Sequence, residues 1–229
     1  AGQHYDNEMA GEIIHQLNVN VSLDLTVHNN NLRPIDIMSN MIVGIYDQLG
    51  SLIPNPDWVI VFGDSNTSLS AAIAAAKLKL RIAHVEAGAR CGDLSVPEEQ
   101  NRVVVDHLAS VNFVTAQGDL HNLSRENKIQ NAYWVGDLNY DLITRLKSKL
   151  APKFRAFSSK SYILLTLHHE ENTNAPHILK SLFYMLSNYQ LPIVFVTHPN
   201  TRLHLKRYNL DNIPNFIYVE GMTYFEMLT

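Results

Sequence analysis

Two apolar runs of this 229-residue chain each end at an acidic residue. Residues 58–62 lead into Gly63 and Asp64, and residues 81–85 lead into Glu86. Short apolar runs of this kind predict strands, and we expect the first strand to be buried on both faces. Open α/β sheets bind ligands at the carboxyl ends of their strands. Carboxyl groups that meet there can act as general acid and general base if their surroundings separate their pKa values.

A third carboxylate follows the second strand after a polar loop. Pro97 is predicted to open a helix, which places Glu98 and Glu99 in a first turn where the helix dipole favours negative charge. Structural roles compete with catalytic ones here, since Asp64 could cap the next helix and Glu98 could simply stabilise its own. Glu86 has no helix start to cap. The three carboxylates Asp64, Glu86 and Glu98 are therefore taken together as one candidate set.

The elements that position these residues alternate along the chain. Strands are expected at residues 58–62, 81–85, 111–115, 132–135, 161–167, 193–196 and 216–219. Helices are expected at residues 34–49, 69–78, 119–125, 139–150 and 178–186, and from residue 97. This alternation predicts the α/β class with parallel strands in a doubly wound sheet.

The polar stretch at residues 151–160, which contains Pro and Ser, indicates a linker between two domains. We expect residues 1–150 to form an N-terminal Rossmann-like domain that carries the acidic residues. Residues 161–229 would begin a second Rossmann-like domain.

Composition limits the classes of function. With 46% apolar residues the chain is typical of a soluble globular protein. The net charge of −4 gives no basic stripe, so neither nucleic acid nor an anionic membrane is an expected partner. No apolar run approaches the ~20 residues of a transmembrane helix, and we see no secretory signal. The one cysteine, Cys91, excludes a disulfide framework and suits a reducing, cytoplasmic location.

Histidines gather after the strand predicted at residues 161–167, but we expect no metal site there. His168 and His169 are followed by Glu170 and Glu171. Neighbouring residues on an extended strand point to opposite faces, which works against their joint ligation of one ion. A lone His at a strand end is more often a loop residue than a catalyst, so His168 needs further support.

That support comes from the sequence around each candidate. The motifs are Gly-Asp-Ser-Asn-Thr at 63–67, His-Val-Glu-Ala-Gly-Ala-Arg at 84–90 and Pro-Glu-Glu-Gln-Asn-Arg at 97–102, followed by Asp-His-Leu-Ala at 106–109. In this order and spacing they resemble the UDP-N-acetylglucosamine 2-epimerase family, chiefly its non-hydrolysing bacterial and archaeal branch. The resemblance covers nearly all of this chain, whereas the chain covers only the middle of the family. Both domains are therefore expected to be incomplete.

The resemblance implies a GT-B-like fold, in which two Rossmann-like doubly wound domains face a cleft and the second, begun here by residues 161–229, binds the nucleotide. It implies a catalytic set of Asp64, Glu86, Glu98 and His168. It implies a substrate-binding set of Arg90, Asn101, Arg102, Asn172, His198 and Arg202. Arg102 follows Glu98 by four residues, and we expect the two to form an i,i+4 pair that orients the carboxylate.

Two parts of the chain depart from the family pattern. The family has Thr-Gly-His-Arg-Arg-Glu-Asn where residues 166–172 read Thr-Leu-His-His-Glu-Glu-Asn, and the lost arginines are bidentate phosphate donors. Gln3 matches the start of a loop near which some bacterial members bind a regulatory substrate molecule. Asp6 stands where the second Gln of that loop is expected, so no regulation is predicted.

The reaction that the resemblance implies is inversion at C2 of UDP-N-acetylglucosamine, which supplies precursors of cell-surface polysaccharides. The C2 proton is not acidic, because no carbonyl lies next to it. The family expels UDP across the C1–C2 bond to form a 2-acetamidoglucal, then adds UDP back with the proton on the other face. Carboxylates would move the proton, and His168 would assist the departing diphosphate. Which carboxylate is acid and which is base stays open.

Two other functions stay open as well. A hydrolysing relative would release N-acetylmannosamine and UDP, and an inactive fragment or a glycosyltransferase of the same architecture would only share the nucleotide-sugar site. The expected partners are UDP-N-acetylglucosamine and UDP, with a homodimer for the full-length protein. Neither NAD nor a metal is expected as a cofactor, and the chain has no Gly-x-Gly-x-x-Gly motif.

Overall fold

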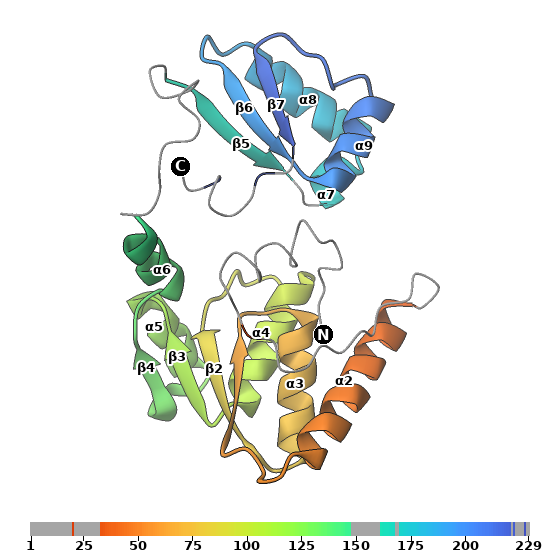
Figure 1. The fold of residues 1–229 in the computed structure, drawn as a ribbon. Coiled ribbons are helices and arrows are strands. Elements are labelled where there is room, and N and C mark those ends of the chain that lie inside the picture. The colour runs from red at the N-terminus through yellow and green to blue at the C-terminus, as the bar shows by residue number, and fades with distance from the viewer. Residues whose placement is uncertain are drawn as a thin grey trace. The chain divides into compact units, whose positions relative to one another are not determined.

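A computed structural model describes residues 33–147, 161–167 and 170–220 of the chain, together with residues 20, 222 and 227. The side chains at positions 170, 171, 199 and 200 are not described. The polypeptide divides into two compact units, of which the first ends at Arg145 and the second runs on from Leu146 (Figure 1). The linker expected at residues 151–160 lies outside the described residues.

The first unit contains a four-stranded parallel sheet in the order β1-β2-β3-β4. Its strands are β1 (Trp58–Phe62), β2 (Arg81–Ala87), β3 (Val111–Val114) and β4 (Ala132–Trp134). Its helices are α2 (Pro34–Ser51), α3 (Asn66–Lys77), α4 (Pro97–Leu108), α5 (Gln117–Arg125) and α6 (Leu138–Leu146), with a 3-10 turn η2 (Ile129–Asn131). Because all strands run the same way, their carboxyl ends meet at one edge.

Helices α2, α3 and α4 lie side by side along the sheet (Figure 1). The alanines of α3 allow close packing, and Ala72, Ala74 and Ala75 are each 0% exposed. Together with Val61, Ile82 and other apolar side chains, alanines of this helix form the core between the helices and one face of the sheet. This core holds the carboxyl ends of β1 and β2 in fixed register.

The prediction that β1 is buried on both faces is wrong for the residues that the structure describes. Trp58, Ile60 and Phe62 point to the same face and are 38%, 58% and 57% exposed. The helices cover the other face, where Val61 is buried. Within the described part of the chain β1 pairs only with β2, so an apolar run marks the strand without showing which of its faces is covered.

The second unit contains a three-stranded parallel sheet in the order β5-β6-β7. Its strands are β5 (Ile163–Leu167), β6 (Ile193–Thr197) and β7 (Phe216–Glu220), and its helices are α7 (Glu170–Thr173), α8 (Pro176–Ser187) and α9 (Pro199–Arg207). An aromatic core joins the sheet to α8, in which Phe183 stacks on Phe216 at 4.8 Å and meets Phe195 edge-on at 5.7 Å. Leu205 of α9 packs into the same core.

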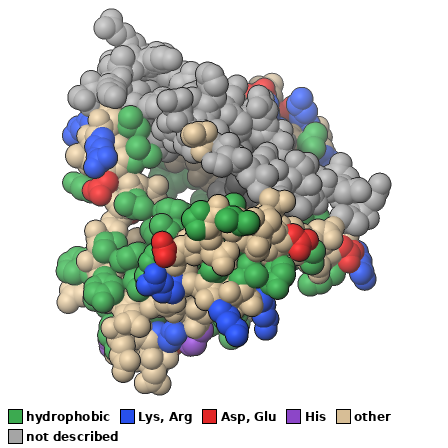
Figure 2. Space-filling view, turned by 60° about the horizontal axis from the view of Figure 1, so that its bottom comes forward, with side chains coloured by type: hydrophobic (Ala, Val, Ile, Leu, Met, Phe, Trp, Pro, Cys, Tyr) green, Lys and Arg blue, Asp and Glu red, His purple; other side chains and the backbone are tan. Residues whose placement is uncertain are grey.

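The predicted α/β class is confirmed, with parallel strands in both sheets. On the face displayed in Figure 2, basic and acidic side chains are scattered among apolar and uncharged ones. Among the described helices, none combines the length and the apolar character that crossing a membrane requires.

Candidate active site

Glu86 lies on a bulge near the carboxyl end of β2. The pairing of β2 with β3 shifts register between Val85 and Ala87, and Glu86 has a φ of 68°. The left-handed region is uncommon for residues other than glycine and asparagine, and such backbone strain is concentrated at functional sites. Bulges next to active sites re-aim a side chain. This bulge supplies a structural signal for Glu86 that its sequence position alone does not carry.

The structure brings Glu86 together with the end of β1. A Cβ atom added to Gly63 would lie 3.4 Å from Oε2 of Glu86, so the carboxylate lies against the backbone of the residue that precedes Asp64. Gly63 has a φ of 63°, and its amide donates to the Val85 oxygen at 2.9 Å. On the other side, Nδ2 of Asn139 in α6 lies 3.4 Å from Oε1 of Glu86.

Asp64 forms an ion pair rather than a helix cap. Ser65 is the N-cap of α3, and its hydroxyl accepts from the Ser68 amide. The guanidinium of Arg102 donates to Oδ2 of Asp64 and, at 3.2 Å, to Oε2 of Glu99. The expected pairing of Arg102 with Glu98 is therefore wrong. The buried Glu99, one turn away on the same helix, takes its place.

The two glutamates that open α4 have different surroundings. Glu98 is exposed, whereas Glu99 is 2% exposed. The amides of Gly92 and Cys91 donate to the Glu99 carboxylate at 2.9 and 3.1 Å. Burial acts to raise the pKa of Glu99, but these amide hydrogen bonds and the charge of Arg90 outweigh it and hold that pKa below its usual value. Glu99 thus fixes the loop between β2 and α4, a role that the sequence did not reveal.

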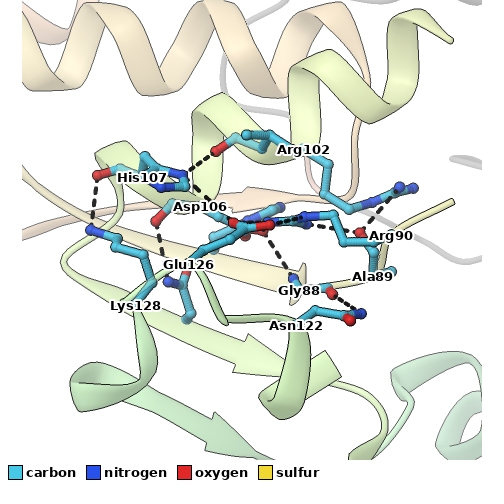
Figure 3. Close-up of polar contacts among 12 residues, drawn as sticks. Gly88, Ala89, Arg90, Arg102, Asp106, His107, Asn122, Glu126 and Lys128 are labelled. Atoms are coloured by element: carbon cyan, nitrogen blue, oxygen red, sulfur yellow. Dashed lines mark hydrogen bonds and ion pairs between the residues drawn. The ribbon is translucent and has the colours of Figure 1, made fainter. Parts of the chain in front are cut away.

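Arg90 is paired with two acidic side chains, Glu126 and Asp106 (Figure 3). Its Nε and Nη2 atoms donate to the two oxygens of Glu126, each at 2.7 Å, and Nη2 also lies 2.7 Å from Oδ2 of Asp106. Burial acts to lower the pKa of Arg90, but the hydrogen bonds to both carboxylates raise it. With its side chain 11% exposed, Arg90 has the surroundings of a structural residue, and its predicted contact with substrate has no support from this geometry.

Asn101 joins helix α4 to the loop after β1. Its Nδ2 donates to the backbone oxygen of Asp64 at 2.8 Å and to Oδ1 of Asn66 at 2.9 Å. Only 6% of Asn101 is exposed. Asn101, which was predicted to bind substrate, therefore lies next to the backbone of Asp64 and holds it by a hydrogen bond.

The second unit places its candidates near the carboxyl ends of its own strands. His198 follows β6 and is half-buried, and Nη1 of Arg202 in α9 lies 2.6 Å from Oε2 of Glu220 at the end of β7. Asn172 lies in the short helix α7. The hydroxyl of Thr201 donates to the Leu167 oxygen at 2.8 Å, which ties α9 to the end of β5. His168 comes next in sequence and lies outside the described residues.

Within the described part of the chain, no three His, Cys, Asp or Glu residues are grouped as ligands of a metal ion. The described catalytic candidates of the first unit are carboxylates, of which Asp64 pairs with the Arg102 guanidinium and Glu86 lies beside the Asn139 amide. Such an arrangement is suited to proton transfer on a bound organic ligand.

The chain is similar in sequence to known 2-epimerases. The chain is 33% identical to a UDP-N-acetylglucosamine 2-epimerase homolog of Methanococcus maripaludis, over 99% of this chain and 66% of the relative. It is 32% identical to the UDP-2,3-diacetamido-2,3-dideoxy-D-glucuronate 2-epimerase of Pseudomonas aeruginosa, over 91% of this chain and 60% of the relative. The chain thus spans no more than about two thirds of these relatives.

Among solved structures, the Methanocaldococcus jannaschii UDP-GlcNAc 2-epimerase, in complex with UDP-GlcNAc and UDP, matches with a TM-score of 0.85 and 33% identity. The match covers 99% of this chain and 66% of that one, and it confirms the predicted GT-B-like fold class. The profile of the UDP-N-acetylglucosamine 2-epimerase family matches residues 1–229. The chain therefore belongs to the UDP-N-acetylglucosamine 2-epimerase family.

Proposed function

We propose that this chain carries the proton-transfer site of a non-hydrolysing 2-epimerase that interconverts UDP-N-acetylglucosamine and UDP-N-acetylmannosamine. The observation that carries the proposal is the position of the Glu86 carboxylate beside Gly63, 3.4 Å from where a Cβ atom on that residue would lie, which brings Glu86 and Asp64 to one sheet edge. Family membership supports the choice of reaction, and the archaeal relative solved with UDP-GlcNAc and UDP supports the choice of substrate.

The proposed reaction proceeds by elimination and re-addition. A carboxylate removes the proton at C2 while the bond from C1 to the UDP oxygen breaks, and the electron pair forms the C1–C2 double bond of a 2-acetamidoglucal. Re-addition delivers a proton to the opposite face of C2 and restores the bond from C1 to UDP. This sequence needs two groups on opposite sides of the sugar and stabilisation of the departing diphosphate.

The different contacts of Asp64 and Glu86 favour different roles for these two carboxylates in the reaction. Arg102 holds one oxygen of Asp64 as an ion pair, whereas Glu86 lies 3.4 Å from the neutral side-chain amide of Asn139. We therefore assign removal of the C2 proton to Glu86. Asp64 orients the sugar and takes part in proton return with Glu98, whose exposed side chain lies in the first turn of α4.

In this proposal the second unit binds UDP. His198 and Arg202 lie beside the carboxyl ends of β6 and β7, where parallel sheets bind ligands. His168, directly after β5 in sequence, assists the departing diphosphate, and Asn172 contributes to the same binding region. Arg202 exchanges its ion pair with Glu220 for the phosphate, because guanidinium groups bind phosphate oxygens in a bidentate manner.

A second candidate substrate follows from the Pseudomonas aeruginosa relative, which is named a 2-epimerase of UDP-2,3-diacetamido-2,3-dideoxy-D-glucuronate. That sugar has the same 2-acetamido group and would be inverted at the same carbon by the same carboxylates. It differs by an acetamido group at C3 and a carboxylate at C6. A cationic partner for that carboxylate is the feature that would favour it.

We extend the proposal to the assembly and the location of the protein. The family resemblance favours a homodimer, and light scattering after gel filtration would test it by yielding twice the chain mass. The single cysteine, Cys91, favours a cytoplasmic location. The reaction as written balances without an added cofactor.

Product analysis tests the proposed function. The chain is incubated separately with UDP-N-acetylglucosamine and with the diacetamido glucuronate, and the products are separated and identified by NMR. The proposal expects UDP-N-acetylmannosamine from the first substrate, at a higher kcat/KM than for the second. Free N-acetylmannosamine with UDP would establish the hydrolysing reaction instead, and turnover of the glucuronate alone would establish the second candidate.

A further inference from the structure

A buried pair of side chains lies between the loops that carry Asp64 and Glu86. His84 of β2 and Asp106 of α4 are each 0% exposed, and Nδ1 of His84 lies 2.6 Å from Oδ1 of Asp106. The other ring nitrogen, Nε2, lies 2.9 Å from the backbone oxygen of Gly63.

The second oxygen of the Asp106 carboxylate has its own partners. Oδ2 accepts from the Gly88 amide at 3.1 Å, and it pairs with Arg90 at 2.7 Å. Figure 3 shows Asp106 together with Gly88, Arg90 and Glu126 in this group. Arg90 and Glu126 are partly exposed, so they lie between the buried pair and the surface.

The positions of the hydrogens follow from these partners. The carbonyl oxygen of Gly63 can only accept, so Nε2 of His84 carries a hydrogen. The Oδ2 atom of Asp106 faces two donors and can only accept. One proton therefore lies between Nδ1 of His84 and Oδ1 of Asp106, in a short charge-assisted hydrogen bond. The ring cannot rotate without losing a bond at both of its nitrogens.

Each end of this pair holds one of the two carboxylate loops. Gly63 immediately precedes Asp64, and Gly88 follows Glu86 by two residues. Both glycines have left-handed backbone, with φ of 63° and 79°. The Gly63 amide bonds to the Val85 oxygen and Asn122 donates to the Gly88 oxygen, and the buried pair adds a direct link between the two loops. The His84–Asp106 pair therefore connects the ends of β1 and β2 through fixed hydrogen bonds.

Stability alone does not explain why such a pair is buried here. The cost of desolvating two charged groups largely offsets their attraction, so a buried ion pair adds little net stability. Ile82 and Val105, on the same two elements, already belong to the apolar core between the helices and the sheet. What the pair adds is a defined geometry at the strand ends.

We propose that His84 and Asp106 are positioning residues, which hold the Asp64 and Glu86 carboxylates in register for proton transfer at C2 of the sugar. The pair is buried, and its hydrogen bonds to Gly63 and Gly88 are the contacts through which it would position the two carboxylates. The catalytic part of this inference rests on the proposed epimerase function, whereas the structural coupling of the two loops does not.

The structural coupling is tested by amide hydrogen exchange on an Asp106→Asn variant. Asn has no charge and only one acceptor oxygen, so the hydrogen bonds that Gly88 and Arg90 donate to this side chain become weaker, while its NH2 group faces Nδ1 of His84. Exchange at the Gly88 amide should then accelerate about tenfold or more, because local opening of the loop becomes easier. Val105→Ala is the matched control, since Val105 is the preceding residue in α4, is 0% exposed and packs in the core. It should accelerate exchange across the core without singling out Gly88.

The catalytic part is tested by steady-state kinetics on the same variants and on His84→Gln, which serves if Asp106→Asn does not fold. We expect kcat to fall on the order of 100-fold, as a small misplacement of catalytic groups does, with KM changed less than about threefold. The double variant should lose no more activity than the worse single variant, because the two residues act as one unit. At temperatures below its unfolding transition, Val105→Ala should have the same kcat as the unsubstituted chain.

The outcomes separate this inference from the proposed function. Equal exchange at Gly88 in Asp106→Asn and Val105→Ala would overturn the coupling, and an equal kcat in these two folded variants would overturn the positioning role. Losses of kcat that multiply when His84→Gln and Asp106→Asn are combined would also contradict the positioning role. If the unsubstituted chain does not invert C2, the proposed function fails, and the Gly88 exchange still decides whether the pair couples the loops.

Discussion

Glu98 and Glu99 illustrate how the surroundings of a single side chain decide its role. They are neighbours in the first turn of α4, yet Glu98 is exposed and Glu99 is buried with two amide donors. Successive residues of a helix point about 100° apart, so only one of the two can face the β2–α4 loop. The exposed residue remains available for a ligand, and the buried one maintains the loop.

Substitution of each glutamate by glutamine should separate these roles. We expect Glu98→Gln to lower kcat while lowering the free energy of unfolding by less than about 1 kcal/mol, the contribution of an exposed first-turn carboxylate. Glu99→Gln should lower that free energy by about 2 kcal/mol, because it removes charge-assisted hydrogen bonds from a buried site. Urea unfolding and steady-state kinetics on both variants provide the check. An unstable Glu98→Gln with normal kcat would contradict the assignment of Glu98.

Acid should weaken the contribution of Glu99 to stability. Its pKa in the folded protein lies below the ordinary value of about 4.5, so folding favours the ionised form. The stabilisation is complete above about pH 4.5 and is lost as the pH falls through the folded pKa. The difference in free energy of unfolding between the unsubstituted chain and Glu99→Gln should thus be constant near neutral pH and shrink below about pH 4.5. A difference that grows on acidification would contradict this.

Arg90→Lys tests the structural role of Arg90. Lysine cannot reproduce the two parallel hydrogen bonds to Glu126 together with the bond to Asp106. We expect a loss of about 1–3 kcal/mol in the free energy of unfolding, since hydrogen bonds to charged groups at a largely buried site are lost. KM for UDP-N-acetylglucosamine should change little. A large rise in KM with unchanged stability would return Arg90 to the substrate-binding set.

At the scale of elements, the turn after β2 is fixed by its close approach to α5. Gly88 has a φ of 79°, and a Cβ atom there would lie 2.7 Å from the backbone oxygen of Asp119. Asn122 of α5 also donates to the Gly88 oxygen at 3.0 Å. Only glycine fits this contact, which explains the Gly that follows Glu86 in the sequence.

Gly88→Ala should therefore be strongly unfavourable, while a matched substitution nearby should not. We expect Gly88→Ala to lower the free energy of unfolding by about 1–3 kcal/mol or more, through strain and contact with backbone. A Cβ atom added to Gly118 of α5 would meet open space among the described residues, so Gly118→Ala should be neutral or stabilising by up to about 1 kcal/mol. Thermal unfolding of both variants gives the comparison, and similar effects would contradict it.

The elements themselves were largely predictable. β1 and the strands β6 and β7 begin where expected, because short apolar runs between turn residues define them. Helix α9 was not anticipated, since Pro199–Arg207 is polar and its apolar contacts come mainly from Leu205. The burial of β1 on one face depends on which elements cover the sheet, and that information is not local.

The candidate site was predictable only in part, because some of its features also depend on contacts between residues that are distant in the sequence. Strand ends located Asp64 and Glu86, because parallel strands deliver their following residues to one edge. The left-handed bulge at Glu86 depends on pairing with β3, so the sequence of β2 alone does not reveal it. Arg90 pairs with Glu126, which comes 36 residues later in the sequence. A pairing between residues so far apart in the sequence depends on the fold and cannot be inferred from a local motif.

At the scale of the whole molecule, the proposed activity draws on both units. The first unit carries Asp64, Glu86 and Glu98, and the second carries His198 and Arg202 beside its own strand ends. The chain spans 66% of the Methanococcus maripaludis relative, so its activity must be measured on this polypeptide rather than assumed from the relative. His168 lies outside the described residues and stays a prediction.

The most direct measurement is proton NMR of UDP-N-acetylglucosamine incubated with this chain in deuterated water, beside a Glu86→Gln control. The proposed mechanism predicts deuterium at C2 in UDP-N-acetylmannosamine and in recovered substrate, with both signals lost in the control. Circular dichroism and UDP binding would establish that each preparation is folded. A folded chain that binds UDP without exchanging the C2 proton, or a Glu86→Gln variant that exchanges it as fast as the unsubstituted chain, would contradict the central claim.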